Sequence, residues 1–175
     1  MRIILLISSC ILLFGCKHYK DPDPFSDDRI NKHYCNDPSA INFNWDFPGI
    51  PDNNVCIYPA QIFSGNYFYH DSILGKDLSV LGVDSFPITV SQIDSTRLKI
   101  LGLCGTEFYT AKANRFFQFT LDTVVGNGQQ FCNPLDTISG NGKKFSIADT
   151  STIKLSYQLL SDTGISYHSG TAIKL

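Results

Sequence analysis

Residues that favour helices are scarce in this chain of 175 residues, and so are long apolar runs. It holds one Glu, one Met and six Ala, which argues against a helical bundle or a coiled coil. There are 14 basic and 16 acidic residues, a formal net charge of −2. This balance lacks the basic excess of a nucleic-acid-binding protein, so no nucleic-acid partner is expected. After residue 16, no segment approaches the roughly 18 apolar residues that a membrane-spanning helix needs.

Aromatic residues and turn-forming residues are plentiful by contrast. The chain holds 13 Phe, 8 Tyr, 1 Trp and 13 Gly, a composition typical of strands joined by turns. Its hydrophobic fraction of 43% is too high for a disordered chain. We therefore expect an all-β domain of ordinary size with some additional segments.

The first 15 residues are predicted to be a signal peptide. Arg2 precedes an uncharged, mostly apolar stretch over 3–14, a length that suits a signal-peptide core and is too short to span a bilayer. The stretch ends in Leu13-Phe14-Gly15-Cys16, which resembles the lipobox of bacterial lipoproteins. The resemblance implies cleavage before Cys16 and attachment of acyl chains such as palmitate to that residue, so that the membrane is a partner through the lipid. An ordinary signal peptide cut elsewhere is the alternative.

Residues 16–34 are predicted to form an extended tether. They include the charged, proline-containing stretch KDPDPFSDD at 20–28, which cannot bury a core. Lys17 follows Cys16, and the Asp found at that position in inner-membrane lipoproteins is absent. The resemblance therefore implies an outer-membrane protein on the periplasmic or the surface-exposed face.

Four cysteines remain after the signal peptide and Cys16 are set aside. An even number in an exported protein indicates disulfides. Three pairings are possible, and the local pairing is favoured because each pair lies within its own segment. No CxxC spacing suggests zinc, and no thiol is left over for redox or nucleophilic chemistry. The expected bonds are Cys35–Cys56 and Cys104–Cys132.

Residues 35–59 are predicted to be a small module held by the first disulfide. The pattern C-x-D-P-x-A-x-N-F-N, then D-N-x-x-C-x-Y, resembles a short cysteine motif of secreted and lipid-anchored bacterial proteins. Phe43 and Trp45 are expected to tuck against a neighbouring domain. A purely structural role is favoured, and calcium is the alternative because oxygen-bearing side chains alternate here. The calcium candidates are Asp37, Asn42, Asn44, Asp46 and Asp52, with Asn53 as a further one.

Residues 60–175 are predicted to be one antiparallel β domain. Short links such as 94–96 and 161–164 indicate hairpins, whereas 126–128 and 140–142 indicate looser glycine turns or bulges. An eight-stranded up-and-down barrel is favoured over a two-sheet sandwich. The expected strands are 66–73, 86–92, 97–103, 108–113, 116–124, 137–140 continuing to 145–147, 152–159 and 165–174.

Two resemblances concern this β domain. Gly65-Asn66-Tyr67 resembles the opening of lipocalin-like and avidin-like barrels. The stretches 100–104, 138–142 and 170–172 resemble β-rich domains that follow the cysteine module in lipoproteins of environmental bacteria, which implies no established activity. The aromatic side chains are expected to fill the barrel, although they would also suit a ligand cavity. These aromatic residues are Tyr67, Phe68, Tyr69, Phe108, Tyr109, Phe116, Phe117, Phe119 and Phe145.

Catalytic motifs are absent from the sequence, and no catalytic residue or cofactor is assigned. No G-x-S-x-G, HExxH or P-loop pattern occurs, Ser, His and Asp lack spacings that predict a triad, and Glu107 is the only Glu. Most Asp residues are expected at turns. His70 and His168 could approach each other across a closed barrel, but surface or rim positions are favoured.

The expected function is therefore that of a lipid-anchored, non-catalytic binding or adhesion module in the cell envelope. Its partner would be a glycan, a small apolar ligand or another envelope protein. A structural or assembly lipoprotein without a ligand and a hydrolase with an unrecognised site are the alternatives.

Overall fold

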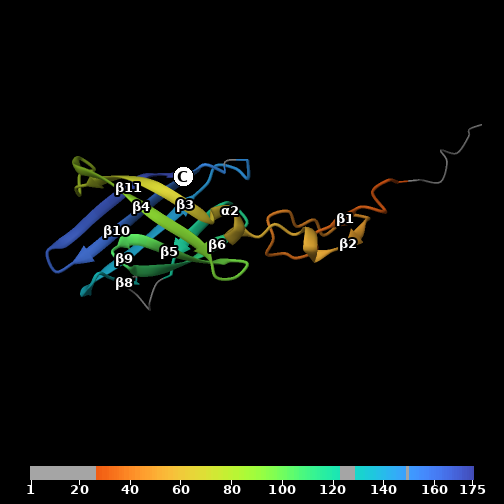
Figure 1. Cartoon of the computed structure of the whole chain (residues 1–175), viewed down its shortest axis with the longest axis horizontal. Helices are drawn as coiled ribbons and strands as arrows, with labels where there is room; N and C mark the ends of the chain where they lie inside the picture. Colours follow the sequence, from red (N-terminus) through yellow and green to blue (C-terminus); the bar gives the residue numbers. More distant parts are fainter. Residues whose placement is uncertain (1–26, 123–128, 149) are drawn as a thin grey trace, which may run out of the picture.

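The computed structural model describes residues 27–122, 129–148 and 150–175. It consists of a small N-terminal module joined to a β-barrel (Figure 1). Within the described ranges, no helix has the length and apolar character needed to cross a membrane. The elements are β1 His33–Tyr34, β2 Ile50–Pro51, η1 Asn53–Val55, α2 Pro59–Phe63, β3 Gly65–Leu74, β4 Val80–Gln92, β5 Arg97–Cys104, β6 Glu107–Asn114, β7 Gln118–Leu121, β8 Gln129–Phe131, β9 Asn133–Lys143, β10 Thr152–Ser161 and β11 Gly164–Lys174.

Eight antiparallel strands close into a barrel, which confirms the predicted fold. The ring runs β3, β4, β5, β6, β7, β9, β10, β11 and back to β3. The additional strand β8 pairs with the first half of β9, while β7 pairs with its second half. The side chain of Gln129 in β8 bonds both backbone groups of Thr110 in β6, with Nε2 donating to the carbonyl at 2.6 Å and Oε1 accepting from the N–H at 2.8 Å. This side chain thereby helps β8 to continue the wall that β7 begins.

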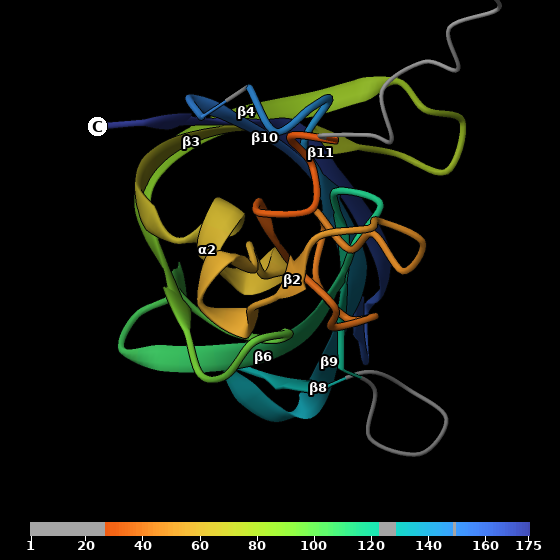
Figure 2. The ribbon, with the colours of Figure 1, turned by 90° about the vertical axis from the view of Figure 1, so that its right-hand side faces the viewer.

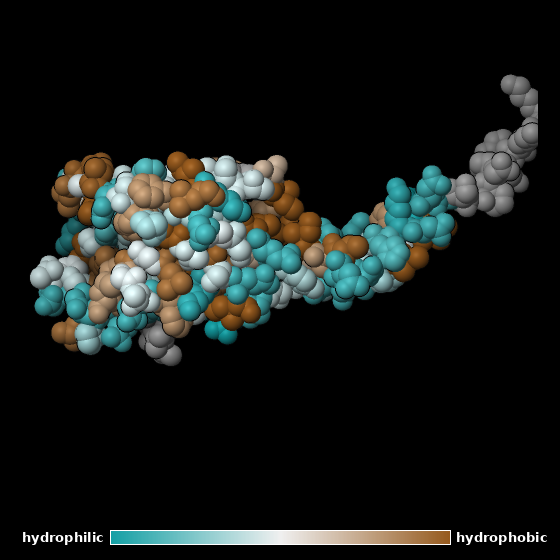
Figure 3. All heavy atoms as spheres, viewed as in Figure 1, coloured by the Kyte–Doolittle hydropathy of each residue, from teal (hydrophilic) through white to brown (hydrophobic). Residues whose placement is uncertain are grey.

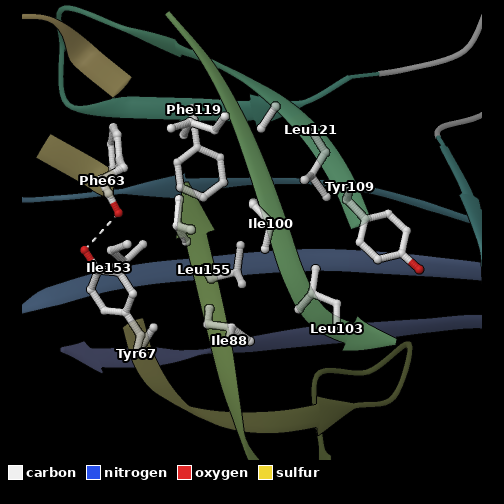
Figure 4. Packing of buried hydrophobic residues seen from close by; sticks show 14 of the residues in the cluster. Phe63, Tyr67, Ile88, Ile100, Leu103, Tyr109, Phe119, Leu121, Ile153 and Leu155 are labelled. Atoms are coloured by element: carbon white, nitrogen blue, oxygen red, sulfur yellow. Dashed lines mark hydrogen bonds between the residues drawn. The ribbon is translucent and has the colours of Figure 1, made fainter. Parts of the chain in front are cut away.

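The barrel interior is filled by side chains that alternate along each strand. Tyr67, Tyr69, Tyr109 and Phe119 are almost completely buried, which is the predicted filling role for these four rings. Phe108, Phe116 and Phe145 are more than half exposed, so these three contradict that prediction. Figure 4 shows how aromatic and aliphatic side chains from opposite walls meet in the core.

One end of the barrel is closed by α2, a helix that the sequence did not indicate. Figure 2 looks toward this end and shows α2 lying across the opening. Ala60 and Phe63 are fully buried, and the Phe63 ring meets the edge of Phe119 with centroids 5.0 Å apart. The Tyr67 hydroxyl donates to the Phe63 carbonyl at 2.9 Å (Figure 4). The end that lies away from the module carries the β3–β4 and β10–β11 hairpins (Figure 1).

Three predicted boundaries in the barrel are wrong. Residues 140–142 are not a turn but lie in the last part of β9, which runs unbroken to Lys143. An added Cβ at Gly142 would lie 2.1 Å from Cζ of Phe119, so glycine serves close packing there. β4 begins at Val80 rather than at 86 because its first half forms a hairpin extension with β3. The expected strand 116–124 is reduced to β7 at 118–121, and residues 123–124 and the turn at 126–128 lie outside the described residues.

Both predicted disulfides are confirmed. Cys35–Cys56 closes the module, with Cα atoms 4.8 Å apart, and Cys104–Cys132 joins the end of β5 to the β8–β9 turn. The module core consists of Cys35, Ala40 and Cys56 with Tyr58 packed against it. The expectation for Trp45 is wrong, since its side chain is 76% exposed.

Candidate functional site

A buried carboxylate lies inside the barrel, in the half away from α2. Asp71 follows Tyr67 and Tyr69 on the inward-facing side of β3, because alternate residues of a strand share one face. Only 4% of Asp71 is exposed. Its neighbour across the ladder, Asp84 of β4, is exposed. The fold therefore removes one of two adjacent carboxylates from water.

Three side chains converge on Asp71 and satisfy its oxygens. The Tyr69 hydroxyl lies 3.0 Å from Oδ1, the Tyr157 hydroxyl lies 3.2 Å from Oδ2, and Nδ1 of His168 lies 2.5 Å from Oδ2. The His168 side chain is 10% exposed and stacks on the Tyr157 ring, with centroids 4.5 Å apart and planes at 8°. We call Asp71, Tyr69, Tyr157 and His168 the carboxylate cluster.

The cluster suppresses ionisation of its two tyrosines. Burial raises the pKa of the Tyr69 and Tyr157 hydroxyls well above the usual value, and the charge of Asp71 raises both further. Both hydroxyls therefore remain protonated donors at physiological pH. A buried carboxylate with three such partners meets the hydrogen-bond requirement of a low-dielectric interior.

The hydrogen bonds continue from His168 to Ser166. Nε2 of His168 lies 3.2 Å from Oγ of Ser166, so Ser, His and Asp follow one another through the atoms that a hydrolase triad uses. The surroundings differ from such a site. Ser166 lies within the regular β10–β11 ladder opposite Leu159, not on a sharp turn that presents free N–H groups for an oxyanion. This arrangement orients the imidazole firmly but supplies no evident oxyanion donors.

The structure confirms the surface position expected for His70 but not that expected for His168, and the two side chains do not meet. His70 points outward and lies 3.0 Å from Ser85, whereas His168 points inward. In the ladder, His70 is paired with Thr171 and His168 with Ile73. Sequence reasoning missed Asp71 because aspartate was attributed to turns. The signal that could have found it is its position in Tyr67-x-Tyr69-x-Asp71, where the alternation calls for an inward residue.

A shallow groove lies on the outer surface above this cluster, across β9, β10, β11 and the end of β3. Its volume is about 450 Å³. Short side chains at outward positions form its floor, and Gln158 Nε2 donates to Ser139 Oγ at 2.9 Å. Among the residues that the structure describes, no Lys, Arg, Asp or Glu lines it. Its lining residues are Leu74, Ser139, Gly140, Asn141, Ser156, Tyr157, Gln158, Tyr167, His168 and Ser169.

The composition of this groove suits an uncharged polar ligand. Tyr167 supplies an aromatic ring at its border, and Asn141 and Gln158 supply amide groups beside several hydroxyls. Apolar contact area with a few polar groups that fix orientation is the usual composition of a small-molecule site. The groove is shallow and widely open to solvent.

Several calcium candidates of the module are occupied by hydrogen bonds within the protein. Asp37 accepts from the N–H and hydroxyl of Ser39 at 2.9 and 2.7 Å and from the Tyr58 hydroxyl at 2.9 Å. These bonds lower the pKa of Asp37, the Ser39 hydroxyl most of all. Asn42 bridges Val55 and Ile57, and Asp52 caps η1.

These interactions hold the turns of the module together. Asn44 and Asp46 are exposed, and Asp52 also bonds His33 at 2.8 Å. Among the described residues, no three His, Cys, Asp or Glu side chains are placed to hold a metal ion. Cys16 and the first part of the tether lie outside the described ranges, so lipidation of Cys16 stays a prediction.

The chain resembles few known proteins. No protein-family model matches it, and no curated protein matches its sequence. Among solved structures, a protein of unknown function from the DUF3598 family of Nostoc punctiforme matches with a TM-score of 0.40 and 12% identity. The match covers 66% of this chain and 49% of that one, so this chain spans about half the length of that protein.

Proposed function

We propose that this protein is a lipid-anchored binding module of the bacterial cell envelope, held in the outer membrane through acylated Cys16. The lipobox-like Leu13-Phe14-Gly15-Cys16 and the charged stretch at 20–28 support the anchor. The disulfides support export, because such bonds persist in oxidising compartments. The small module lies between the barrel and the N-terminal segment that would carry the lipid (Figure 1), which suits presentation of a binding surface.

The observation that carries the binding role is the uncharged polar groove beside Tyr167. We infer that it accepts a neutral glycan, whose ring faces pack on an aromatic side chain and whose hydroxyls bond amides and serines. An apolar ligand inside the barrel is less well supported, because Tyr67, Tyr69, Tyr109 and Phe119 fill the interior. The role is non-catalytic, and adhesion to a polysaccharide surface follows from it.

Binding to defined oligosaccharides tests this role. The whole mature chain with Cys16→Ser is titrated with cellohexaose and, separately, with chitohexaose, while amide resonances are followed by NMR. We expect shifts confined to β9, β10 and β11, and at least a tenfold loss of affinity in Tyr167→Ala. Phe108→Ala removes an outward aromatic side chain from β6 and should leave affinity unchanged. Shifts among interior residues, or no shifts with either sugar, would contradict the proposal.

The anchor has its own test. Cys16→Ala should move the protein from the membrane fraction to the soluble fraction of the cell that makes it. Retention of this variant in the membrane fraction would show that Cys16 lipidation is not what holds the protein there.

A second candidate function, acyl hydrolysis, is favoured only by the Ser166–His168–Asp71 chain of hydrogen bonds. It requires Ser166 Oγ to attack an ester carbonyl while His168 Nε2 takes the proton and returns it to the leaving alcohol. A water molecule must then attack the acyl-serine, with His168 Nε2 taking its proton and returning it to Ser166 Oγ as the free acid leaves. A fluorophosphonate probe would then label the native protein and Ser169→Ala, in which an outward serine is replaced, but not Ser166→Ala. Absence of labelling in the native protein would eliminate this candidate.

A further inference from the structure

The first half of β4 has a free backbone edge. Val80 and the residues from Gly82 to Val90 pair with β3 on one side, with a bulge at Leu81, but on the other side β5 pairs only with Thr89 to Gln92. No other strand in the described ranges pairs with the segment 80–86. An unpaired strand edge presents N–H and carbonyl groups that another strand can bond. The edge is about seven residues long, comparable to an ordinary strand.

The same segment carries exposed apolar side chains. Val80, Leu81 and Val83 are 62%, 70% and 78% exposed, and Leu78 in the preceding turn is 71% exposed. Figure 2 shows the β3–β4 hairpin extending beyond the barrel wall, and Figure 3 shows hydrophobic surface gathered at that corner of the barrel. Asp84 is the only charged residue within 80–86. Lysine or proline, which often protects an exposed edge, is absent from 80–86.

We propose that this edge binds the same edge of a second copy of this chain, in antiparallel register about Gly82. In this register Leu81 lies opposite the second copy's Val83, and Val83 lies opposite its Leu81. The two-fold symmetry therefore brings four apolar side chains together on the outer face of a continuous sheet. Such a self-complementary contact is the usual geometry of a two-fold dimer.

Charge favours the register centred on Gly82 over one centred on Asp84. Centring on Asp84 would place two carboxylates directly opposite each other, which is destabilising. Centring on Gly82 places Asp84 opposite Val80 of the second copy. At Gly82 the closest heavy atom to an added Cβ is Cδ1 of Ile73 at 3.8 Å, so a side chain can be introduced at residue 82 without a clash.

The position of the hairpin determines the shape of the dimer. The hairpin lies at the end of the barrel opposite the N-terminal module (Figure 1). Antiparallel pairing there places the two barrels end to end, with their N-terminal modules at opposite extremes. If each chain is anchored through Cys16, which rests on the proposed function, the dimer joins two membrane surfaces and the contact is adhesive.

The contact is small, and the affinity in solution should be modest. A strand pair with four apolar side chains falls in the class of weak interfaces that bury less than about 1,200 Å². We expect a dissociation constant of roughly 10–100 μM. Many anchored copies on two facing membranes would strengthen it by multivalency.

Sedimentation equilibrium of the whole mature chain with Cys16→Ser tests the dimer. We expect reversible dimerisation that Val83→Lys weakens at least tenfold. Leu135→Lys, which changes an apolar β9 residue of similar exposure, 77%, should leave it unchanged. Circular dichroism establishes that both variants are folded. A monomer up to 1 mM, or a dimer unaffected by Val83→Lys, would overturn the proposal.

Two cysteine substitutions test whether the strands pair in the register centred on Gly82. Gly82→Cys should form an intermolecular disulfide without added catalyst, because residue 82 lies opposite its own copy, whereas Ser85→Cys on the same strand should not. Equal cross-linking at both positions would refute the Gly82-centred register.

Vesicles separate this inference from the lipid anchor. Lipidated native protein on phosphatidylethanolamine–phosphatidylglycerol vesicles should aggregate them, and lipidated Val83→Lys should not. A dimer in solution combined with dispersed vesicles would refute the end-to-end arrangement. Loss of membrane attachment, seen directly by flotation, would instead refute the anchor and leave the solution dimer as the measured result.

Discussion

Replacement of Asp71 by Asn should destabilise the barrel far more than replacement of Asp84, its direct neighbour in the β3–β4 ladder. Asp71 accepts hydrogen bonds from three side chains of the carboxylate cluster. Asn retains one acceptor oxygen but turns an NH₂ group toward donors. Tyr69 keeps a second acceptor, the Leu155 carbonyl at 3.2 Å. The donors that would lose their acceptor are therefore the Tyr157 hydroxyl and the His168 imidazole.

The magnitude follows from the cost of leaving buried donors without acceptors. Each such group costs about 1–3 kcal/mol, so the loss of two acceptors in Asp71→Asn should lower the free energy of unfolding by about 2–6 kcal/mol. Asp84→Asn should change it by less than about 0.5 kcal/mol, as expected for an exposed position. Urea unfolding with the disulfides intact measures both, with an unchanged denaturant slope as the sign that the native state is preserved.

A double-mutant cycle with Tyr157→Phe identifies the cause. If the cluster acts as one network, the double variant should be less destabilised than the sum of the two single variants by about 1 kcal/mol or more. Equal effects of Asp71→Asn and Asp84→Asn, or strict additivity with Tyr157→Phe, would refute the reasoning that the carboxylate is paired and buried.

Three further perturbations follow from the same structure. Replacing Cys104 and Cys132 by Ser opens a loop with a sequence separation of 28 residues and should cost about 3–4 kcal/mol in urea unfolding; an unchanged midpoint would contradict this. Both cluster tyrosines have a raised pKa in the folded state, so the stability that they contribute is fully present below about pH 10 and decreases as the pH rises above it. The free energy of unfolding should then fall by up to about 1.4 kcal/mol per pH unit for each tyrosine. Tyr157→Phe should reduce this pH dependence by about half, as measured by unfolding between pH 9 and 11. Gly142→Ala places a Cβ against Phe119 and should cost about 1–3 kcal/mol, whereas unaltered thermal unfolding would show that β9 can shift.

The barrel could be predicted because its best strands alternate cleanly. Ile88 and Val90, and likewise Leu98 and Ile100, are buried in the structure, as their period of two indicates. The local sequence pattern was misleading where the role of a residue depends on a partner that is distant in the sequence. Gly142 was assigned to a turn, but it is required by the Phe119 ring on the neighbouring strand.

The candidate site was harder to foresee for the same reason. Aspartate commonly bonds nearby backbone N–H groups, and Asp94 does so with Thr96 and Arg97. Asp71 instead bonds side chains that are 86 and 97 residues away in the sequence. Only the closure of β11 onto β3 brings them together, and neither composition nor local spacing encodes that contact.

Native mass spectrometry of the protein extracted from its own envelope tests whether it is a lipid-anchored module that holds a neutral glycan in its outer groove. We expect a chain that begins at acylated Cys16 and carries a bound neutral saccharide, which the Tyr167→Ala protein lacks. A free thiol at Cys16, or an apolar ligand that remains bound in Tyr167→Ala, would contradict it.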